Sequence, residues 1–168
     1  MTSLFEIRRE AQISACAKYR YHLVRHWDDG AQPLPIIMLN PSIADASIDD
    51  PTIKRCMAFA RREMFGGIRV FNLFAFRATD PAKMMAAGDP IGPENDQHIE
   101  DALDRSASSR LPVLAAWGVS GKHLGRAQAV MAMAKRIGAN MQCLGKTQGG
   151  DPRHPLYVKR DSPLIPFG

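Results

Sequence analysis

The sequence contains little cysteine and no long apolar run, and both absences exclude classes of protein. The 168 residues include three cysteines, Cys16, Cys56 and Cys143, which lie far apart and outside any metal-ligand spacing. A disulfide framework and a zinc site are therefore not expected, and we interpret the cysteines as small buried apolar residues. No apolar stretch approaches the roughly 18 to 20 residues that span a bilayer, and the amino terminus lacks a basic segment followed by an apolar one. These absences predict a soluble, cytoplasmic protein without a membrane partner.

Internal repeats, low-complexity tracts and linkers are also missing, so we expect one domain over residues 1–168. A hydrophobic content of 45% is enough to bury a core. The formal charge of +5 and the pI near 9.4 favour a polyanionic partner. An excess this small is also common in proteins that bind no nucleic acid, so charge leaves the class of partner open.

Four apolar runs end abruptly in polar residues. The runs are residues 35–39, 68–71, 113–117 and 141–144, and they lead into Asn40, Asn72, Gly118 and a loop that holds His154. Segments with helical spacing separate them, an alternation that is typical of parallel strands with crossover helices. The carboxyl ends of such strands share one edge of the sheet, where ligands bind. We predict a three-layer α/β/α domain with a central, mostly parallel four-stranded sheet and one cleft lined by four strand ends.

Residues 19–27 alternate apolar and polar side chains before a turn at 28–30, which predicts an added amino-terminal hairpin or edge strand. Helical spacing follows Asp50 and Pro51, a favourable cap and first-turn pair. Further helices are predicted near 81–87, 94–105 and 124–137.

The basic residues of the first predicted helix fall largely on one face, and they are Lys54, Arg55, Arg61 and Arg62. Such a face is either solvated surface or a surface that follows the phosphates of a nucleic acid. The acidic residues before this helix, Asp45, Asp49 and Asp50, are explained more simply as a capping turn than as a metal site. We predict neither a metal nor a cofactor.

Seven motifs together resemble the DUF1643 family, whose name records an unknown function. They are residues 19–21, 38–42, 49–53, 72–81, 92–96, 116–118 and 152–157. The resemblance extends from Tyr19 to Phe167.

The order of four landmarks is also similar to that of the uracil-DNA glycosylase superfamily. The landmarks are Asn40 with Pro41, Asn72, Trp117 with Gly118, and His154 with Pro155 and Leu156. The resemblance implies that Asn40 orients a hydrolytic water, that Pro41 shapes its loop, and that Asn72 reads the edge of a nucleobase. It implies that His154 hydrogen-bonds the base carbonyl as negative charge develops. The adjoining Ser42 and Arg153 complete the candidate substrate-binding set.

This resemblance implies an enzyme or base-recognition protein acting on a nucleobase N-glycosidic bond, with DNA or a nucleotide as partner. Two alternatives stay open, namely a non-catalytic nucleotide- or nucleic-acid-binding module and a hydrolase or transferase of free nucleosides. Each site residue also has a structural alternative: turn starter for Asn40, strand cap for Asn72 and loop packing for His154. No aromatic residue lies between Asn40 and Phe59 to stack on an extruded base, which argues against flipping from a duplex.

Overall fold

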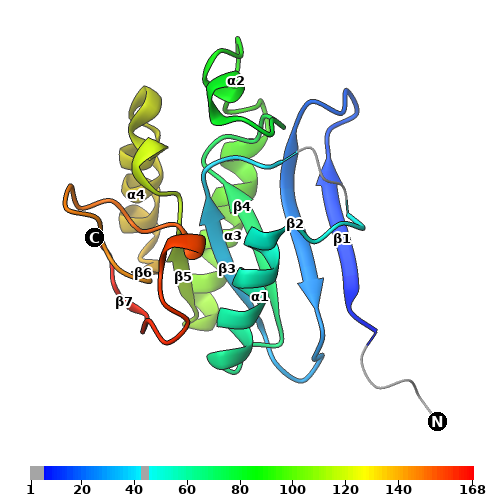
Figure 1. Ribbon diagram of the computed structural model, residues 1–168, viewed down its shortest axis with the longest axis vertical. Helices are drawn as coiled ribbons and strands as arrows, with labels where there is room; N and C mark the ends of the chain where they lie inside the picture. The colour runs from blue at the N-terminus through cyan, green and yellow to red at the C-terminus, as the bar shows by residue number, and fades with distance from the viewer. Residues whose placement is uncertain (1–5, 43–45) are drawn as a thin grey trace.

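The computed structural model describes residues 6–42 and 46–168, and in this part of the chain seven strands form one mixed sheet. The sheet order is β1-β2-β4-β3-β5-β6-β7 (Figure 1). The strands are β1 Arg8–Ile13, β2 Arg20–His26, β3 Pro33–Met38, β4 Gly67–Asn72, β5 Pro112–Ala115, β6 Asn140–Cys143 and β7 Ile165–Pro166. The predicted mixed α/β architecture is confirmed, but the sheet has seven strands where four were expected.

The additional strands explain this difference. β1 and β2 form an antiparallel hairpin that joins the sheet through β4, and the short β7 pairs antiparallel with β6. β4, β3, β5 and β6 run parallel to their neighbours. The antiparallel additions satisfy the backbone groups that the parallel edge strands would otherwise expose.

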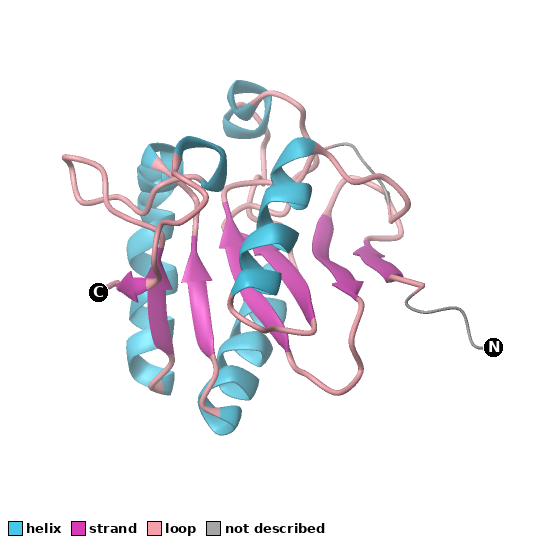
Figure 2. Ribbon diagram, turned by 60° about the horizontal axis from the view of Figure 1, so that its bottom comes forward, coloured by secondary structure: helices cyan, strands magenta, loops and turns pink. Residues whose placement is uncertain are grey.

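Helices cover both faces of the sheet (Figure 2). They are α1 Pro51–Arg62, α2 Pro81–Met85, α3 Asn95–Ser109 and α4 Arg126–Ile137, with 3-10 turns η1 Val119–Gly125 and η2 Pro155–Tyr157. Ile36 packs in the cluster that contains α1, whereas its neighbour Ile37 packs in the cluster that contains α3 and α4. This alternation follows from the two-residue repeat of a strand and divides the apolar core between the two faces.

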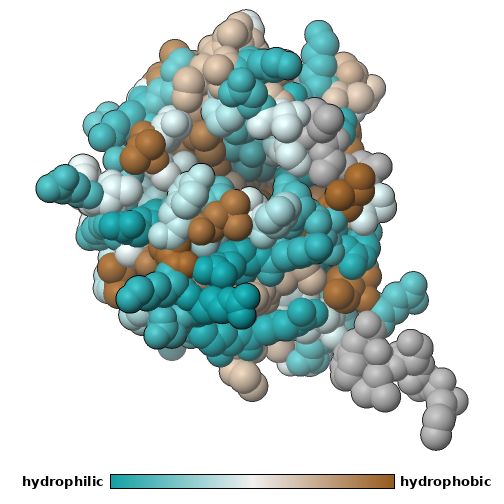
Figure 3. Space-filling model, viewed as in Figure 1, coloured by the Kyte–Doolittle hydropathy of each residue, from teal (hydrophilic) through white to brown (hydrophobic). Residues whose placement is uncertain are grey.

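The first predicted helix begins as expected. The Asp50 carboxylate accepts a hydrogen bond of 2.8 Å from the Ile53 backbone N–H, and Pro51 occupies the first turn. The outer face of α1 forms a hydrophilic surface (Figure 3). The cap therefore fixes α1 with its amino-terminal end beside the carboxyl end of β3.

The chain order places β3 between β4 and β5. The connection from β3 to β4 carries α1, and the connection from β4 to β5 carries α3 and crosses to the other side of β3. Strand order therefore reverses between β3 and β5, and this reversal opens a crevice at their carboxyl ends. The predicted cleft lies at this topological position.

Two further expectations from the sequence concern the cysteines and membrane-spanning helices. Cys56 and Cys143 are buried as predicted, but Cys16 is exposed because it lies in the turn between β1 and β2. Among the described residues, no helix has the length and apolar character needed to cross a membrane.

Candidate functional site

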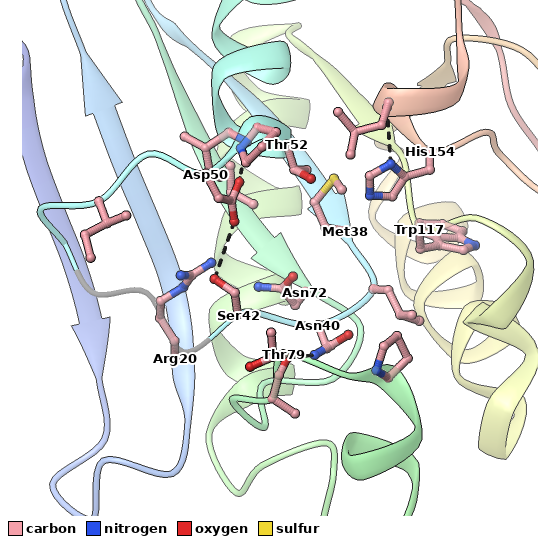
Figure 4. Close-up of a pocket in the computed structure, with 18 of the residues that line it drawn as sticks. Arg20, Met38, Asn40, Ser42, Asp50, Thr52, Asn72, Thr79, Trp117 and His154 are labelled. Carbon is pink, nitrogen blue, oxygen red and sulfur yellow. Dashed lines mark hydrogen bonds between the residues drawn. The ribbon is translucent and has the colours of Figure 1, made fainter.

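A cavity of about 720 Å³ opens at the carboxyl ends of β3, β4 and β5 (Figure 4). The start of α1 and the loop before η2 close its sides. The lining includes Asn40, Ser42, Asn72, Trp117 and His154, all singled out from the sequence. Parallel strands therefore bring together side chains that are more than one hundred residues apart in the chain. We call this space the strand-end cavity.

Asn72 ends β4 and is the least exposed polar side chain in the lining, at 1%. Among the described residues its Nδ2 has no hydrogen-bond partner. A buried donor without a partner costs about 1 to 3 kcal/mol. The amide therefore offers a hydrogen bond to an acceptor that enters the cavity.

The backbone beneath Asn72 is held by two side chains that sequence reasoning missed. Asn95 Nδ2 donates to the Asn72 carbonyl at 3.0 Å and to the Leu73 carbonyl at 3.1 Å. The buried Arg126 donates from Nε to the same Leu73 carbonyl at 2.7 Å and pairs with Asp96 at 2.5 Å. Asn95, which belongs to the motif of residues 92–96, therefore fixes the end of β4.

His154 caps η2, and its ring adopts one defined tautomer when neutral. The Leu156 backbone N–H donates to His154 Nδ1 at 3.2 Å, so the ring proton resides on Nε2. Burial lowers the pKa of His154 below its usual 6.5, although the charge of Asp50 acts in the opposite direction. Near neutral pH the imidazole is therefore an uncharged hydrogen-bond donor on the wall of the strand-end cavity.

Asn40 supports its own loop. Its Nδ2 donates to the Pro41 carbonyl at 3.1 Å and to the Ala78 carbonyl at 2.9 Å. These contacts match the turn-forming alternative for Asn40, and they leave its Oδ1 as the atom available to accept a hydrogen bond. Pro41 does not line the cavity; its carbonyl also accepts from the Ala78 backbone N–H at 3.1 Å, so it shapes the loop from behind.

The acidic residues of this region serve structural contacts. Asp50 accepts from Ser42 Oγ at 3.4 Å in addition to capping α1. Asp49 pairs with Arg9 of β1 at 2.5 Å and with Arg25 of β2 at 2.6 Å. Asp45 lies outside the described residues. Within the described ranges, no group of three or more His, Cys, Asp or Glu side chains is arranged to hold a metal.

Arg20 is a lining residue that the sequence argument did not select as a site residue. It is 4% exposed at the start of β2, and its long side chain reaches the strand-end cavity. Burial lowers the pKa of Arg20 to about 10, against the opposing charge of Asp50. Arg20 is therefore cationic at neutral pH. The residues 19–21 motif was the signal that could have identified it.

Arg153 is not brought to the strand-end cavity. Its side chain packs against Gly145, which has a φ of 130°, and its Nε donates to the Lys146 carbonyl at 3.1 Å. Arg153 therefore packs in the loop at Gly145 and Lys146 and does not line the cavity with the other predicted binding residues.

Most basic residues of α1 contact other parts of the same protein. Arg55 donates to the carbonyls of Pro155 and Val158, and Arg62 donates to the Arg160 carbonyl at 2.8 Å. Arg61 lies over the Trp27 ring, with its guanidinium carbon 4.4 Å from the ring centre. The contacts of Arg55 and Arg62 fasten the segment after His154 onto α1, and Arg61 packs on the residue that follows β2. They favour the structural interpretation of this face over a surface that follows phosphates.

A family described as "Protein of unknown function (DUF1643)" matches residues 20–156. The chain belongs to this family. The DUF1643 match begins at Arg20 and ends at Leu156, so it includes every strand-end cavity residue discussed above. None of the curated proteins and none of the solved structures matches the chain. The comparisons therefore support the DUF1643 resemblance and give no support to the predicted resemblance to the uracil-DNA glycosylase superfamily.

Proposed function

We propose that this DUF1643 protein binds a nucleobase in the strand-end cavity and hydrolyses its N-glycosidic bond. The observation that carries the proposal is the buried Nδ2 of Asn72, which has no partner among the described residues and lines the same cavity as the neutral His154 ring. Two fixed donors favour a ligand with carbonyl acceptors. A keto pyrimidine such as uracil presents such acceptors along its edge.

The roles of the site residues follow from the charge that develops in this reaction. Water adds to the anomeric carbon while the C–N bond breaks, and the bonding electron pair leaves with the base. The Nε2–H of His154 stabilises the negative charge on the base carbonyl, as a preorganised donor does in an oxyanion hole. Asn40 Oδ1 accepts a hydrogen bond from the attacking water, whose proton passes to solvent. The oxocarbenium character of the sugar makes a strong general base unnecessary.

Free nucleosides and nucleotides fit this cavity better than duplex DNA does. Arg55 and Arg62 of α1 are engaged with backbone carbonyls. Arg153 lies away from the strand-end cavity. Binding to duplex DNA relies on several Lys and Arg contacts to phosphates.

A non-catalytic nucleobase-binding module is the second candidate, and Asn40 favours it. The Asn40 amide donates to two backbone carbonyls, an arrangement that a loop brace requires whether or not a reaction follows. In that case Asn72 and His154 would hold a base without cleavage of any bond.

The test is a mass-spectrometric screen for released base, with free nucleosides, nucleotides, single-stranded DNA and duplex DNA as separate substrates. Base release from any of them supports the enzyme, and the most active substrate identifies its class. Saturable nucleoside or nucleotide binding without release supports the binding module. If neither release nor binding is found, the nucleobase proposal is wrong.

Asn72→Asp provides the specificity test. The substitution keeps the size of the side chain but replaces a donor by an acceptor, so the preference should move from keto pyrimidines toward amino pyrimidines by about tenfold or more. Relative rates, or affinities if no reaction occurs, measure the change. Asn140→Asp is the matched control because Asn140 is exposed on β6, and it should leave the ranking unchanged. An unchanged ranking in Asn72→Asp removes Asn72 from base recognition.

A further inference from the structure

A second cavity, of about 310 Å³, lies at the opposite end of the parallel strands. Residues at the start of β3, in β4 and in the carboxyl-terminal half of α3 line it, together with parts of β1 and β2. Three arginines, Arg8, Arg69 and Arg105, contribute to the lining. We call this space the basic cavity.

Arg69 is the unusual member of this group. It lies in β4 between Val24 of β2 and Pro35 of β3, so its stem crosses an apolar part of the sheet. Its Nε is buried without a hydrogen bond, and no other residue in the described ranges gives Arg69 a hydrogen bond or an ion pair. A half-buried guanidinium is normally paired, because desolvation of its charge is costly. Arg69 is therefore available to an anion from outside the chain.

The other two arginines strengthen the positive field instead of neutralising Arg69. Arg105 donates from Nε only to the Asp101 carbonyl of its own helix, at 3.3 Å. Arg8 pairs with Glu10 at 3.2 Å, and its Nη2 lies 3.1 Å from His26 Nδ1. Among the described residues, Glu10 is the carboxylate that pairs with one of the three guanidinium groups, and the exposed Asp29 lies 3.6 Å from the lining residue His26. The basic cavity carries a net positive charge that suits a ligand with two or more negative charges.

We propose that the basic cavity binds the phosphoryl group of a small molecule, either inorganic pyrophosphate or the phosphates of a nucleotide. Guanidinium groups match the oxygen geometry of a phosphate through paired N–H donors. The volume lies at the lower end of small-ligand sites, which favours a compact anion over a nucleic-acid strand. This site is separate from the strand-end cavity and does not depend on the function proposed for it.

Isothermal titration of the intact protein with sodium pyrophosphate tests the proposal. Saturable binding at one site is expected, and Arg69→Met and Arg105→Gln should each weaken it at least tenfold. Arg105→Gln decides the result if Arg69→Met does not fold, since Arg105 is exposed on α3. Arg136→Gln is the matched control, because Arg136 lies on α4 and pairs with Glu100 outside the basic cavity. It should leave the affinity unchanged.

Parallel titrations distinguish the source of the phosphate. A nucleoside diphosphate that binds more tightly than pyrophosphate identifies a nucleotide site, and equal or weaker binding identifies an inorganic site. The proposal is wrong if pyrophosphate does not bind, or if both cavity variants retain full affinity. It is also wrong if malonate binds as tightly as pyrophosphate, or if only an oligonucleotide binds.

Discussion

The two cavities lie at opposite ends of the same parallel strands and present different chemistry. The strand-end cavity combines two directional, uncharged donors, the buried amide of Asn72 and the neutral ring of His154, with one cation, Arg20. The basic cavity has guanidinium groups with few partners of their own. Directional donors discriminate between ligands of similar charge, whereas clustered cations select for charge. The first cavity matches the proposed recognition of a base edge, and the second matches the proposed binding of an anion.

The arginines themselves show why charge counts are a poor guide to function. Arg55 and Arg62 of α1 look from the sequence like a phosphate-binding face, yet both donate to backbone carbonyls of the carboxyl-terminal segment. Arg69 is inconspicuous in the sequence, yet it is half-buried and has no partner in the described part of the chain. The partners of a charged residue decide whether it is available to a ligand.

His154→Ala should have the largest effect on the strand-end cavity. Loss of one preorganised donor typically lowers turnover by about 100-fold or more, and we expect this loss on whichever substrate the base-release screen identifies. Folding should be retained, because His154 belongs to a loop that Arg55 continues to hold through Pro155 and Val158. Steady-state kinetics and thermal unfolding measure the two effects.

His123→Ala is the control for this variant, because His123 lies outside the lining of the strand-end cavity. It should keep turnover within about twofold of the native value, since no oxyanion-type donor is removed. If His154→Ala folds and retains full turnover, His154 has no part in the reaction.

Asn95→Ala should have the next largest effect, and it acts through support of the site. The substitution removes the two donors that hold the carbonyls of Asn72 and Leu73. The Leu73 carbonyl keeps its hydrogen bond from Arg126, but the Asn72 carbonyl loses the Asn95 donor. A buried acceptor that loses its partner costs about 1 to 3 kcal/mol, so the free energy of unfolding should fall by about 2 kcal/mol. Urea denaturation measures this free energy.

Gln97→Ala on the exposed face of α3 is the control and should change stability by less than about 0.5 kcal/mol. If the two variants have the same free energy of unfolding, Asn95 does not stabilise the end of β4.

The location of the site could be predicted from the sequence because it depends on a simple rule. Asn40 and Trp117 follow β3 and β5, Asn72 ends β4, and His154 lies in the loop after β6; parallel strands bring their carboxyl ends to one edge. The period-two pattern of residues 19–27 predicted a hairpin or edge strand, and these residues contain β2, the inner strand of the β1–β2 hairpin. These features depend on local pattern and chain order.

Residues whose role depends on long-range partners could not be predicted. Asn95 and Arg126 bind the same carbonyl of Leu73 from different helices, and nothing local indicates that either is buried. Arg153 adjoins His154 in the sequence, but its side chain packs against Gly145 and donates to the Lys146 carbonyl. The two-residue β7 was missed because so short a strand has no measurable periodicity. Tertiary context decides each of these cases.

The smallest expected effect is a pH dependence that links His22 to the basic cavity. Burial, the neighbouring His98 and the charges of Arg69 and Arg105 lower the pKa of His22 to about 4. Its pKa in the unfolded chain is about 6.5, so the unfolded chain binds more protons between these values. His22 therefore stabilises the fold fully above pH 6.5, and this stability is lost as the pH falls toward 4. Because the ring is partly exposed, screening reduces the loss to about 1 kcal/mol.

Arg69→Met sharpens the comparison between the two cavities, because it changes this pH dependence without touching the strand-end cavity. Removal of one cation raises the pKa of His22 toward its usual value. The free energy of unfolding should therefore fall less between pH 7 and pH 5 in Arg69→Met than in the native protein. Urea denaturation at the two pH values measures the difference. Arg136→Gln should behave as the native protein does, since Arg136 is not among the charges acting on His22.

Arg69→Met should also gain a few tenths of a kcal/mol of unfolding free energy at pH 7, because an unpaired, partly desolvated charge has been removed. An identical pH dependence in Arg69→Met and the native protein would show that the basic cavity exerts no field on His22, and its charge would then be screened too well to attract an anion.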